Sequence, residues 1–439
     1  MNTKALRQKI LDLAIHGKLV PQDPNDEPAS VLLERIRAEK ERLVKEGKIK
    51  RPKKTKATSD KPHYENVPFE IPDNWVWTTL GEIFTLQAGK NITAKDIYTE
   101  KSEEFKYPCF GGNGIRGYVA ISNKIGEYPI IGRQGALCGN INLAHGIFYA
   151  TEHAVVVERY CDTDLMWGYY TLIALNLNQY ATATAQPGLA VNVINDVAIP
   201  LPPLHEQQRI SKSIKILFSF LDAIECKKLY LKTAISQTKT KVLDLAIHGR
   251  LVPQDPTDEP ATELLKRINP KAEITSDNGH YQKLPEGWVI TPMQILCALV
   301  DGEKQNGIER INLDVKFLRG EREAKVLTSG KYTAANTLLI LVDGENSGEV
   351  FRAPVDGYQG STFKQLSIHE EMYTDYVLQV INLHRKTLRE NKVGSAIPHL
   401  NKKLFKAINV PIPPYEEQKR IVNAINQTFT ILDKIMENL

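Results

Sequence analysis

The sequence predicts a mixed α/β protein in which two globular bodies are joined by long antiparallel coiled-coil helices with circular pseudo-two-fold symmetry. Three observations lead to this fold class. The chain has 439 residues, which is too many for one ordinary domain. It contains two copies of one repeated unit. One stretch of about 45 residues also carries apolar residues at heptad spacing with no helix breaker.

Two pairs of repeated segments frame the bodies. Residues 9–36 and 241–268 are identical at 22 of 28 positions, at a constant offset of 232 residues. Residues 199–224 align with residues 410–435, with 12 identities in 26 positions. Because the segments are so similar, each copy should adopt the same local structure. In the first copy a short helix is expected from Ala29 to about Lys45.

The two bodies lie between these repeats and differ in sequence. Each begins near a matched segment, which reads IPDNWV at 71–76 and LPEGWV at 284–289. Short apolar runs between glycine turns predict strands in both bodies. Apolar periodicity predicts one helix near 165–179 in the first body and one near 374–391 in the second.

The order of the repeated pieces predicts the circular arrangement. The central copy runs without a break from Pro203 to Pro256, whereas the other copy is split between residues 411–439 and 1–36. The two halves rebuild the central copy if the chain ends meet along the central helix. We therefore expect an amino-terminal repeated helical region, a first body, a central repeated region with the long helix, a second body and a carboxyl-terminal repeated helix, at residues 1–50, 67–203, 204–268, 280–413 and 414–439.

The long central helix is expected at 204–248, bounded by Pro203 before it and Gly249 after it. One face of a globular bundle is the alternative, but 45 residues without a breaker exceed what a compact domain needs. The heptad residues should pair the helices and form the partner-binding region. They are Leu6, Ile10, Leu13, Ile210, Ile214, Leu217, Leu221, Ile224, Leu231, Ile235, Val242, Leu245, Ile421, Ile425, Leu432 and Ile435.

Composition narrows the class of protein. The chain is 42% hydrophobic and 25% charged, with 56 basic and 52 acidic residues, so a nucleic-acid surface would have to come from clustered charge. The basic segment at 48–56 is either a solvated linker or a non-specific phosphate contact. The first residues lack the apolar core of a signal peptide, and the five cysteines form no C-x-x-C pair. A cytoplasmic setting without structural zinc is expected.

Motifs for catalysis are missing from the sequence. There is no phosphate-binding G-x-x-x-x-G-K-[ST] loop and no [DN]-P-P-[YF] tetrapeptide of amino-methyltransferases. The segment GGNGIRG at 111–117 is followed by strand-like residues, so a turn is predicted there. His16 and His248 occupy equivalent helix ends and should lie near the last carbonyls. No catalytic residues, metal ligands or cofactor site are therefore predicted.

Taken together, the motifs resemble those of a known family. Two divergent bodies each open near P-x-x-W and close at P-x-P-P-x-x-E-Q, in the segments PLPPLHEQQRI and PIPPYEEQKRI, and DLAIHGxLVPQDP is duplicated. This arrangement resembles the specificity subunit of type I restriction–modification systems over essentially the whole chain.

The resemblance implies a function. Each body would be a target recognition domain that reads one half of a bipartite, asymmetric sequence in double-stranded DNA. The helices would fix the spacing of the halves, and the repeats would dock two modification (methyltransferase) subunits that methylate adenine, to which restriction subunits are added. The chain itself would be non-catalytic and without a cofactor, with S-adenosylmethionine, ATP and Mg on the partner subunits.

Side chains in the glycine turns are the candidate DNA contacts. Arginine can pair with guanine, and asparagine or glutamine with adenine. Ordinary exposed hairpin turns are the alternative interpretation of these loops, and His153 is also compatible with a structural role beside a buried strand. The candidate DNA-binding residues are Asn113, Arg116, Arg133, Gln134 and His153 in the first body, and Asn346, Ser347, Ser361, Thr362 and Lys364 in the second.

Two other functions remain open from the sequence. A coiled-coil adaptor that joins proteins without DNA sequence specificity would need the helices but no basic cleft. A self-contained methyltransferase would need the cofactor loop and the catalytic tetrapeptide, neither of which is found in the sequence.

Overall fold

A computed structural model describes residues 2–49, 69–135, 137–181, 187–271, 284–393 and 398–439. The chain forms two compact units, residues 1–227 and 228–439, and each contains one of the two bodies. Helices and mixed sheets occur in both units, so the predicted α/β class is confirmed. The division into five segments and the circular symmetry stay predictions. Most of the basic segment 48–56 lies outside the described residues.

Two helices precede the first body. α1 (Thr3–Ile15) begins after Asn2, whose side chain accepts a hydrogen bond from the backbone N–H of Ala5. It ends where Gly17 adopts a left-handed φ of +66°. α2 (Ala29–Lys45) has the bounds that the sequence predicts, and it turns one apolar face toward the core.

The first body consists of two four-stranded sheets, with strand orders β2-β9-β6-β7 and β4-β3-β8-β5, and one separate strand pair, β1-β10. Its strands are β1 (Val76–Thr79), β2 (Thr85–Ala88), β3 (Tyr107–Gly111), β4 (Gly114–Val119), β5 (Lys124–Ile125), β6 (Tyr128–Gly132), β7 (Ile141–Ala144), β8 (Ile147–Ala150), β9 (Ala154–Glu158) and β10 (Ala198–Leu201). Its helical segments are α3 (Leu80–Ile83), η2 (Ala94–Asp96), α4 (Leu165–Ala174), η3 (Leu177–Tyr180) and α5 (Val191–Asn195). The helix expected near 165–179 is therefore α4 followed by a short 3₁₀ turn.

The second body has a different sheet plan. One four-stranded sheet has the order β12-β18-β15-β16, and β13, β14 and β17 close into a small barrel. Its strands are β11 (Val289–Pro292), β12 (Cys297–Val300), β13 (Lys304–Leu313), β14 (Val326–Thr333), β15 (Leu338–Leu341), β16 (Val350–Arg352), β17 (Gly357–Gln359), β18 (Phe363–Ile368) and β19 (Asn409–Ile412). Its helices are α8 (Met293–Leu296), α9 (Val315–Leu318), α10 (Thr374–Glu390) and α11 (Lys402–Ala407), and α7 (Ala261–Ile268) precedes this body as α2 precedes the first.

Both bodies are closed by the same kind of strand pair. β1 pairs antiparallel with β10, with Val76 opposite Leu201. β11 pairs antiparallel with β19, with Val289 opposite Ile412. These strands lie at the matched sequence segments. The first and last strands of each body are therefore joined directly beside the repeated helices.

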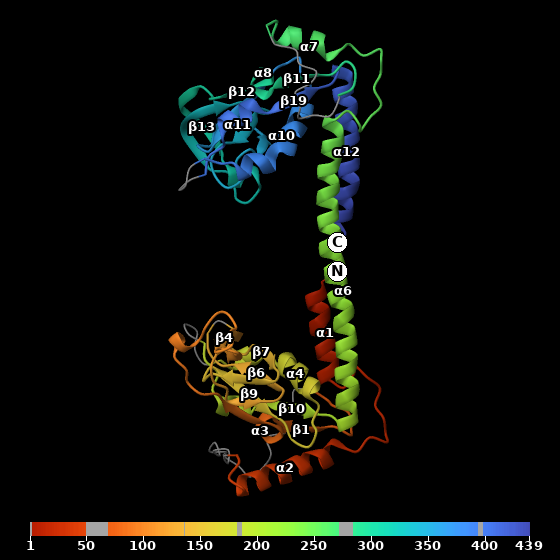
Figure 1. Cartoon of the computed structure of the whole chain (residues 1–439), viewed down its shortest axis with the longest axis vertical. Coiled ribbons are helices and arrows are strands. Elements are labelled where there is room, and N and C mark those ends of the chain that lie inside the picture. The colour runs from red at the N-terminus through yellow and green to blue at the C-terminus, as the bar shows by residue number, and fades with distance from the viewer. Residues whose placement is uncertain (1, 50–68, 136, 182–186, 272–283, 394–397) are drawn as a thin grey trace. The chain divides into compact units, whose positions relative to one another are not determined.

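The long helix α6 (Leu204–Ile247) has 44 residues and confirms the predicted central helix. Within the first unit, α1 lies beside α6 and runs antiparallel to it, since Arg7 contacts Asp222 while Leu11 lies near Ile210 (Figure 1). Within the second unit, α12 (Tyr415–Glu437) lies beside the other part of α6.

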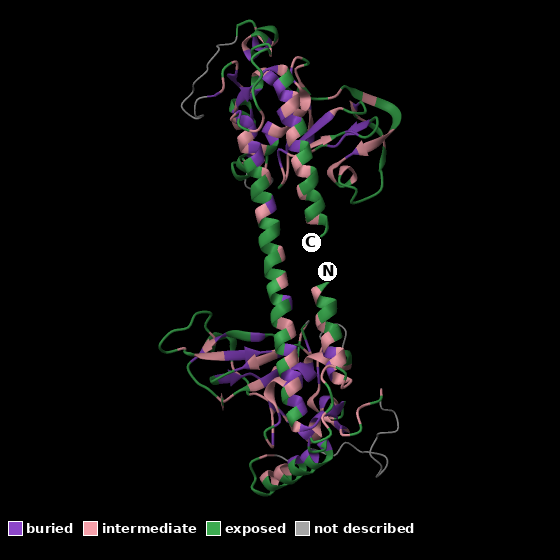
Figure 2. Cartoon of the chain, turned by 90° about the vertical axis from the view of Figure 1, so that its right-hand side faces the viewer, coloured by how far each residue is buried: buried purple, intermediate pink, exposed green. Residues whose placement is uncertain are grey.

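The heptad pattern placed the helical contact face only approximately. Figure 2 shows long exposed stretches on α6 and buried residues where α6 meets the bodies. Seven predicted residues are buried, at Ile210, Ile214, Leu221, Ile235, Val242, Ile421 and Ile425. Six are half-buried, at Ile10, Leu13, Leu217, Ile224, Leu245 and Leu432.

Leu6, Leu231 and Ile435 are 39%, 37% and 41% exposed, so they are not covered within this chain, and their part in partner binding stays a prediction. By contrast, Leu11 and Ala14 are buried, as are their repeat equivalents Leu243 and Ala246, none of which the heptad count included. The reason is visible in the first unit. α1 packs against α4 of the body as well as against α6, so its buried face is wider than a two-helix seam.

Candidate functional site

A buried carboxylate joins three distant parts of the first unit. Glu206, in the first turn of α6, is fully buried. Its Oε2 accepts a hydrogen bond of 2.8 Å from Nε1 of Trp75, and its Oε1 accepts one of 2.6 Å from Nε2 of Gln22. Burial raises the pKa of Glu206 above its ordinary value, although both hydrogen bonds act in the opposite direction. The start of the body and the repeated LVPQDP segment are thereby fixed to α6.

The next residues of the same motif make two further connections. Arg209 donates to both carboxylate oxygens of Asp26, at 2.6 and 3.3 Å, in the two-pronged geometry that arginine favours. Gln207 is fully buried, and its amide donates to the carbonyl of Pro202 at 3.0 Å. Its Oε1 accepts from the backbone N–H of Asp164, the residue that caps α4. The motif E-Q-x-R therefore holds the repeat, the body and the long helix together.

The second unit repeats these contacts one by one. Glu417 is buried and accepts from Nε1 of Trp288 at 3.0 Å and from Nε2 of Gln254 at 3.0 Å. Burial raises its pKa as well. Arg420 donates to both oxygens of Asp258, at 2.6 and 3.4 Å. We call the set in each unit the clamp: Trp75, Gln22, Glu206, Arg209 and Asp26 in the first, and Trp288, Gln254, Glu417, Arg420 and Asp258 in the second.

The pairing of the helices is repeated too. Arg7 donates to Asp222 at 2.6 Å, and its guanidinium lies 4.9 Å from the centroid of the Phe218 ring. At the equivalent positions Lys239 forms an ion pair with Asp433, and its ammonium lies 5.0 Å from the ring centroid of Phe429. Each contact joins a cation from one repeat to an acid and an aromatic ring from the other.

Clamp residues were missed as functional residues by sequence reasoning. The tryptophans and the E-Q motif carried the resemblance to the family, but no contacts between them were predicted. Their duplication at fixed offsets was the available signal. His16 and His248 were placed correctly, because Nδ1 of each ring lies 2.6 and 2.7 Å from the carbonyl oxygen of Asp12 and Asp244 respectively.

In the first body the structure brings the predicted glycine-turn loops together. GGNGIRG forms the β3–β4 hairpin, as predicted. A Cβ on Gly132 would lie only 1.9 Å from the carbonyl oxygen of Gly112, so the two backbones can approach only because residue 132 is glycine. The backbone N–H of Arg133 donates to the carbonyl of His153 at 2.9 Å. The candidate residues of three separate loops therefore form one region.

The side chains of this region differ in how far they are exposed and in the hydrogen bonds they make. Asn113, Arg116 and Gln134 are exposed. Asn113 accepts a hydrogen bond of 3.1 Å from the amide of Asn140. Arg133 is half-buried, and its Nε donates to the carbonyl of Leu189 at 3.2 Å, which orients the guanidinium.

His153 is less accessible to DNA than the other candidate residues of the first body. Its Nε2 lies 3.0 Å from Oε1 of Glu152, and about a third of its side chain is exposed. Its Nδ1 is buried without a hydrogen-bond partner among the described residues. A structural role beside β9, which the sequence left open, agrees with this position.

In the second body, two of the predicted DNA-binding residues are occupied within the chain, one by an ion pair and one by burial. Lys364 forms an ion pair with Asp301, which also pairs with Lys331 at 2.6 Å. These two ammonium groups lower the pKa of Asp301 to about 2. Ser347 is fully buried, so its hydroxyl lines no surface that DNA could reach, and its assignment as a DNA contact disagrees with the structure.

The remaining residues of that set lie around one turn. Asn346 is half-buried, and its carbonyl accepts from the backbone N–H of Glu349. Thr362 is half-buried, and its carbonyl accepts from the N–H of Val342 at 2.8 Å. Ser361, beside it, is exposed. The carbonyl of Thr362 thus contacts the backbone at the end of β15, shortly before the turn that contains Asn346.

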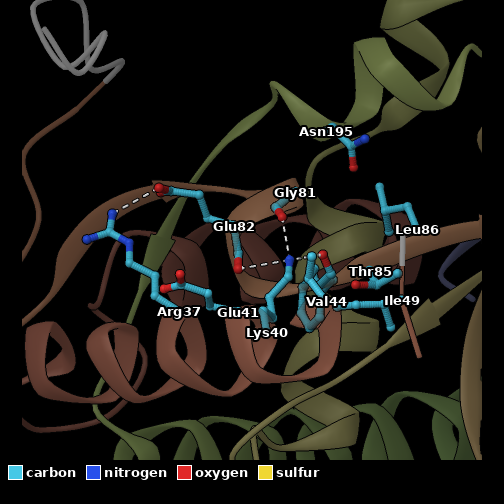
Figure 3. Close-up of a pocket in the computed structure, with 11 residues that line it drawn as sticks. Arg37, Lys40, Glu41, Val44, Ile49, Gly81, Glu82, Thr85, Leu86 and Asn195 are labelled. Carbon is cyan, nitrogen blue, oxygen red and sulfur yellow. Dashed lines mark hydrogen bonds and ion pairs between the residues drawn. The ribbon is translucent and has the colours of Figure 1, made fainter. Parts of the chain in front are cut away.

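The first unit also contains a cavity of about 310 Å³ between α2, α3 and β2 (Figure 3). Nζ of Lys40 donates to the backbone carbonyls of Gly81, Glu82 and Phe84, at 2.6, 3.2 and 2.8 Å. Burial lowers the pKa of this ammonium to about 8. Because the three carbonyls account for its three N–H donors, Lys40 fastens α2 to the body rather than serving as a nucleophile.

Two kinds of feature are absent from the described residues, a metal-binding cluster and a membrane-spanning helix. These residues include no group of three or more His, Cys, Asp or Glu side chains that could hold a metal ion. Their helices include none that is both long and apolar enough to cross a membrane.

Comparison with known proteins places this geometry in a family. The family model described as "Type I restriction modification DNA specificity domain" matches residues 72–234 and 304–439, which is more than half of the chain. The EcoprrI specificity subunit of Escherichia coli is 42% identical over a match that covers 38% of this chain and 41% of that protein. The EcoEI specificity subunit of Escherichia coli is 31% identical, with 99% of this chain and 90% of that protein covered.

A solved structure supports the same fold. It comes from work on complex assembly and conformational transition of the type I restriction–modification system, and it aligns with a TM-score of 0.55 and 16% sequence identity. The alignment covers 84% of this chain and 94% of that chain. With a family model that matches most of the chain and a relative aligned over nearly its whole length, the chain belongs to the family of type I restriction–modification specificity subunits.

Proposed function

We propose that this chain is the non-catalytic DNA-recognition subunit of a type I restriction–modification complex. Each body reads one half of a bipartite, asymmetric target in double-stranded DNA. The repeated helices, which the clamps fix to the bodies, dock two adenine-methyltransferase subunits, and restriction subunits join that assembly. S-adenosylmethionine, ATP and Mg belong to the partner subunits in this proposal.

One observation carries the proposal: the clamp contacts are the same in both units, whereas the sheets of the bodies differ. Trp75 with Glu206 is repeated as Trp288 with Glu417, at 2.8 and 3.0 Å. The first body has two four-stranded sheets, whereas the second has one such sheet and a small barrel. A subunit that binds two copies of one partner needs two like surfaces. A subunit that reads two unlike half-sites needs two unlike surfaces.

The first body offers a surface suited to DNA. Its hairpin and loop region presents exposed Asn113, Arg116 and Gln134 beside the oriented guanidinium of Arg133. Lys90 is exposed, and its backbone N–H donates to Ala150, two residues before the loop of His153. Among the described residues, neither Lys90 nor Arg116 has an ion-pair partner, so both charges are available to DNA.

The proposal is tested by exchanging residues 67–203 for the corresponding body of a relative, in the chain assembled with its modification subunits. Mapping of methylated adenines should then show one changed half of the target, with the other half and the spacing unchanged, because α6 is intact. A target changed in both halves, or in neither, would contradict the modular assignment. An assembly that shows no sequence preference even with the native chain would favour the coiled-coil adaptor instead.

A single residue refines this test. Arg133→Ala removes a fork-shaped donor, and if that donor reads a base, specific binding should weaken by about 1–3 kcal/mol. Binding to unrelated duplexes at low salt should barely change. A uniform loss for all sequences, with a salt slope smaller by about one, would place Arg133 on a phosphate.

A further inference from the structure

The barrel of the second body carries an arginine that is held by an aromatic ring and makes no hydrogen bond among the described residues. Arg310 lies on β13, whose residues 304–310 pair antiparallel with 327–331 of β14 as a two-stranded ribbon, while the ends of both strands pair with β17. The ribbon is mostly exposed and has a register shift between Asn306 and Arg310. The side chain of Arg310 is 22% exposed, so its guanidinium is partly sheltered and still reaches the surface.

Among the described residues, the guanidinium of Arg310 makes no hydrogen bond. Its Nε is buried and has no hydrogen-bond partner among the described residues. The nearest acid is Asp356, whose Oδ2 lies 3.7 Å from Nη1, which is too far for a hydrogen bond. A buried N–H without an acceptor is unfavourable by roughly 1–3 kcal/mol, so such a group in a native structure calls for an explanation.

Three other arginines of the same body form ion pairs with carboxylates. Arg319 is bound to Glu349, and Arg322 is bound to Asp314. Arg385 donates to the other oxygen of Glu349 at 2.9 Å. Arg310 differs from these three because an aromatic ring, and not a hydrogen-bonded carboxylate, holds it.

A small network fixes that ring. The guanidinium carbon of Arg310 lies 4.5 Å from the centroid of Tyr332 on the paired strand β14. The Tyr332 hydroxyl donates to Oδ2 of Asp356 at 3.0 Å, and Oδ1 of Asp356 accepts from the backbone N–H of Ala335 at 2.8 Å. The backbone carbonyl of Tyr332 accepts from the amide of Gln365 at 2.8 Å. A cation–π contact with a fixed ring restricts the position of the guanidinium before any ligand arrives.

We propose that Arg310 is a specificity-determining residue of the second body and that it reads a guanine, donating to O6 and N7 in the major groove. This inference rests on the proposed function and deepens it. A two-stranded ribbon fits the major groove, and the fork of a positioned arginine suits the paired acceptors of guanine. The carboxylate of Asp356 beside it repels a phosphate, whereas a neutral base edge meets no such repulsion.

The test uses the chain assembled with its modification subunits and a pool of random-sequence DNA duplexes, from which bound molecules are recovered and sequenced. The variants are Arg310→Ala and Arg310→Lys, which keeps the charge and the stem but lacks the fork. Arg352→Ala is the matched control, because Arg352 is an exposed arginine on β16 of the same body. Thermal unfolding of each assembly confirms that the variants are folded.

We expect both Arg310 variants to lose the preference for guanine at one position of one half-site. Discrimination there should fall by roughly 5- to 150-fold, as the loss of one bidentate pair implies. The other half-site and the spacing should be unchanged, and Arg352→Ala should select the native target.

Two results would overturn the inference. The first is an unchanged guanine preference in Arg310→Ala. The second is a uniform loss of binding in Arg310→Ala that Arg310→Lys restores, since that pattern indicates a phosphate contact. A native assembly that selects no sequence at all would refute the proposed function itself and the inference with it. Failure of the inference alone leaves a selective native assembly, so the two failures are distinguishable.

Discussion

Nε1 of Trp75 donates a 2.8 Å hydrogen bond to Oε2 of Glu206, which lies 131 residues further along the chain. The same bond joins Trp288 to Glu417 in the second unit at 3.0 Å. Both carboxylates are fully or almost fully buried. In each unit the bond joins the start of the body to the helix that follows its last strand. This buried polar contact therefore helps to fix each body relative to its own repeat.

Removing that carboxylate should destabilise its unit. Glu206→Leu leaves the indole N–H of Trp75 and the amide of Gln22 without their acceptor, and we expect the free energy of unfolding to fall by about 2–4 kcal/mol. Glu417→Leu should do the same in the second unit. A urea titration of each variant measures the change. Glu416→Leu is the matched control, because Glu416 is exposed and should change stability by no more than about 0.5 kcal/mol. Equal effects of Glu416→Leu and Glu417→Leu would contradict the role of the clamp.

The clamp also predicts a pH dependence. Burial raises the pKa of Glu206 and of Glu417 above the value of an unfolded glutamate. Between the unfolded and the folded pKa the folded chain holds more protons, so stability should fall as pH rises through that interval. Below the unfolded pKa this contribution is fully favourable to the fold. Comparison of urea midpoints across this interval for the native chain and for Glu206→Gln with Glu417→Gln tests the sign. The double variant should show a smaller decline, and an identical decline would rule the two carboxyls out.

Glycine at the end of each repeated helix should be essential for two reasons. Gly17 and Gly249 have left-handed φ values of +66° and +64°, and a Cβ on them would lie 2.5 and 2.3 Å from Cγ of Pro72 and Pro285. Gly47 has a similar φ of +70° but nothing within 4 Å of such a Cβ. Gly47→Ala should therefore show only the backbone strain, about 1 kcal/mol. Gly17→Ala and Gly249→Ala should lose clearly more in thermal unfolding, and values equal to that of Gly47→Ala would show that the proline contact is dispensable.

The corrected contact face of the helices can be tested with paired substitutions. Leu221 and Leu243 are buried at 6% and 8% exposure, whereas Leu231 is 37% exposed although the heptad pattern includes it. An aspartate at 221 or 243 would be buried without a partner, and we expect a loss of several kcal/mol and failure to assemble with modification subunits. Leu231→Asp should be tolerated. Circular dichroism and size-exclusion chromatography of the assembly measure both effects, and equal tolerance at 231 and 243 would restore the heptad assignment.

Periodicity and duplication in the sequence determined the framework of this protein. The heptad run bounded by Pro203 and Gly249 predicted α6, and the helix expected from Ala29 to about Lys45 is α2. The divergence between the repeats predicted two different bodies. These features are local or arise by comparing one segment with another, so they can be obtained without knowing the path of the chain.

Tertiary structure alone decided which of these residues meet. No periodicity pairs Trp75 with Glu206 or Arg209 with Asp26, because each pair is brought together by the fold of the intervening body. The buried face of α1 includes Leu11 and Ala14, which the heptad pattern did not predict, because α4 packs against α1. A heptad count describes only the contact with a partner helix. The sequence could show neither the burial of Ser347 nor the unpaired Nε of Arg310, because both depend on neighbours from distant strands. Sequence determined the elements and their duplication, whereas long-range packing determined which side chains are shared, buried or left free to bind.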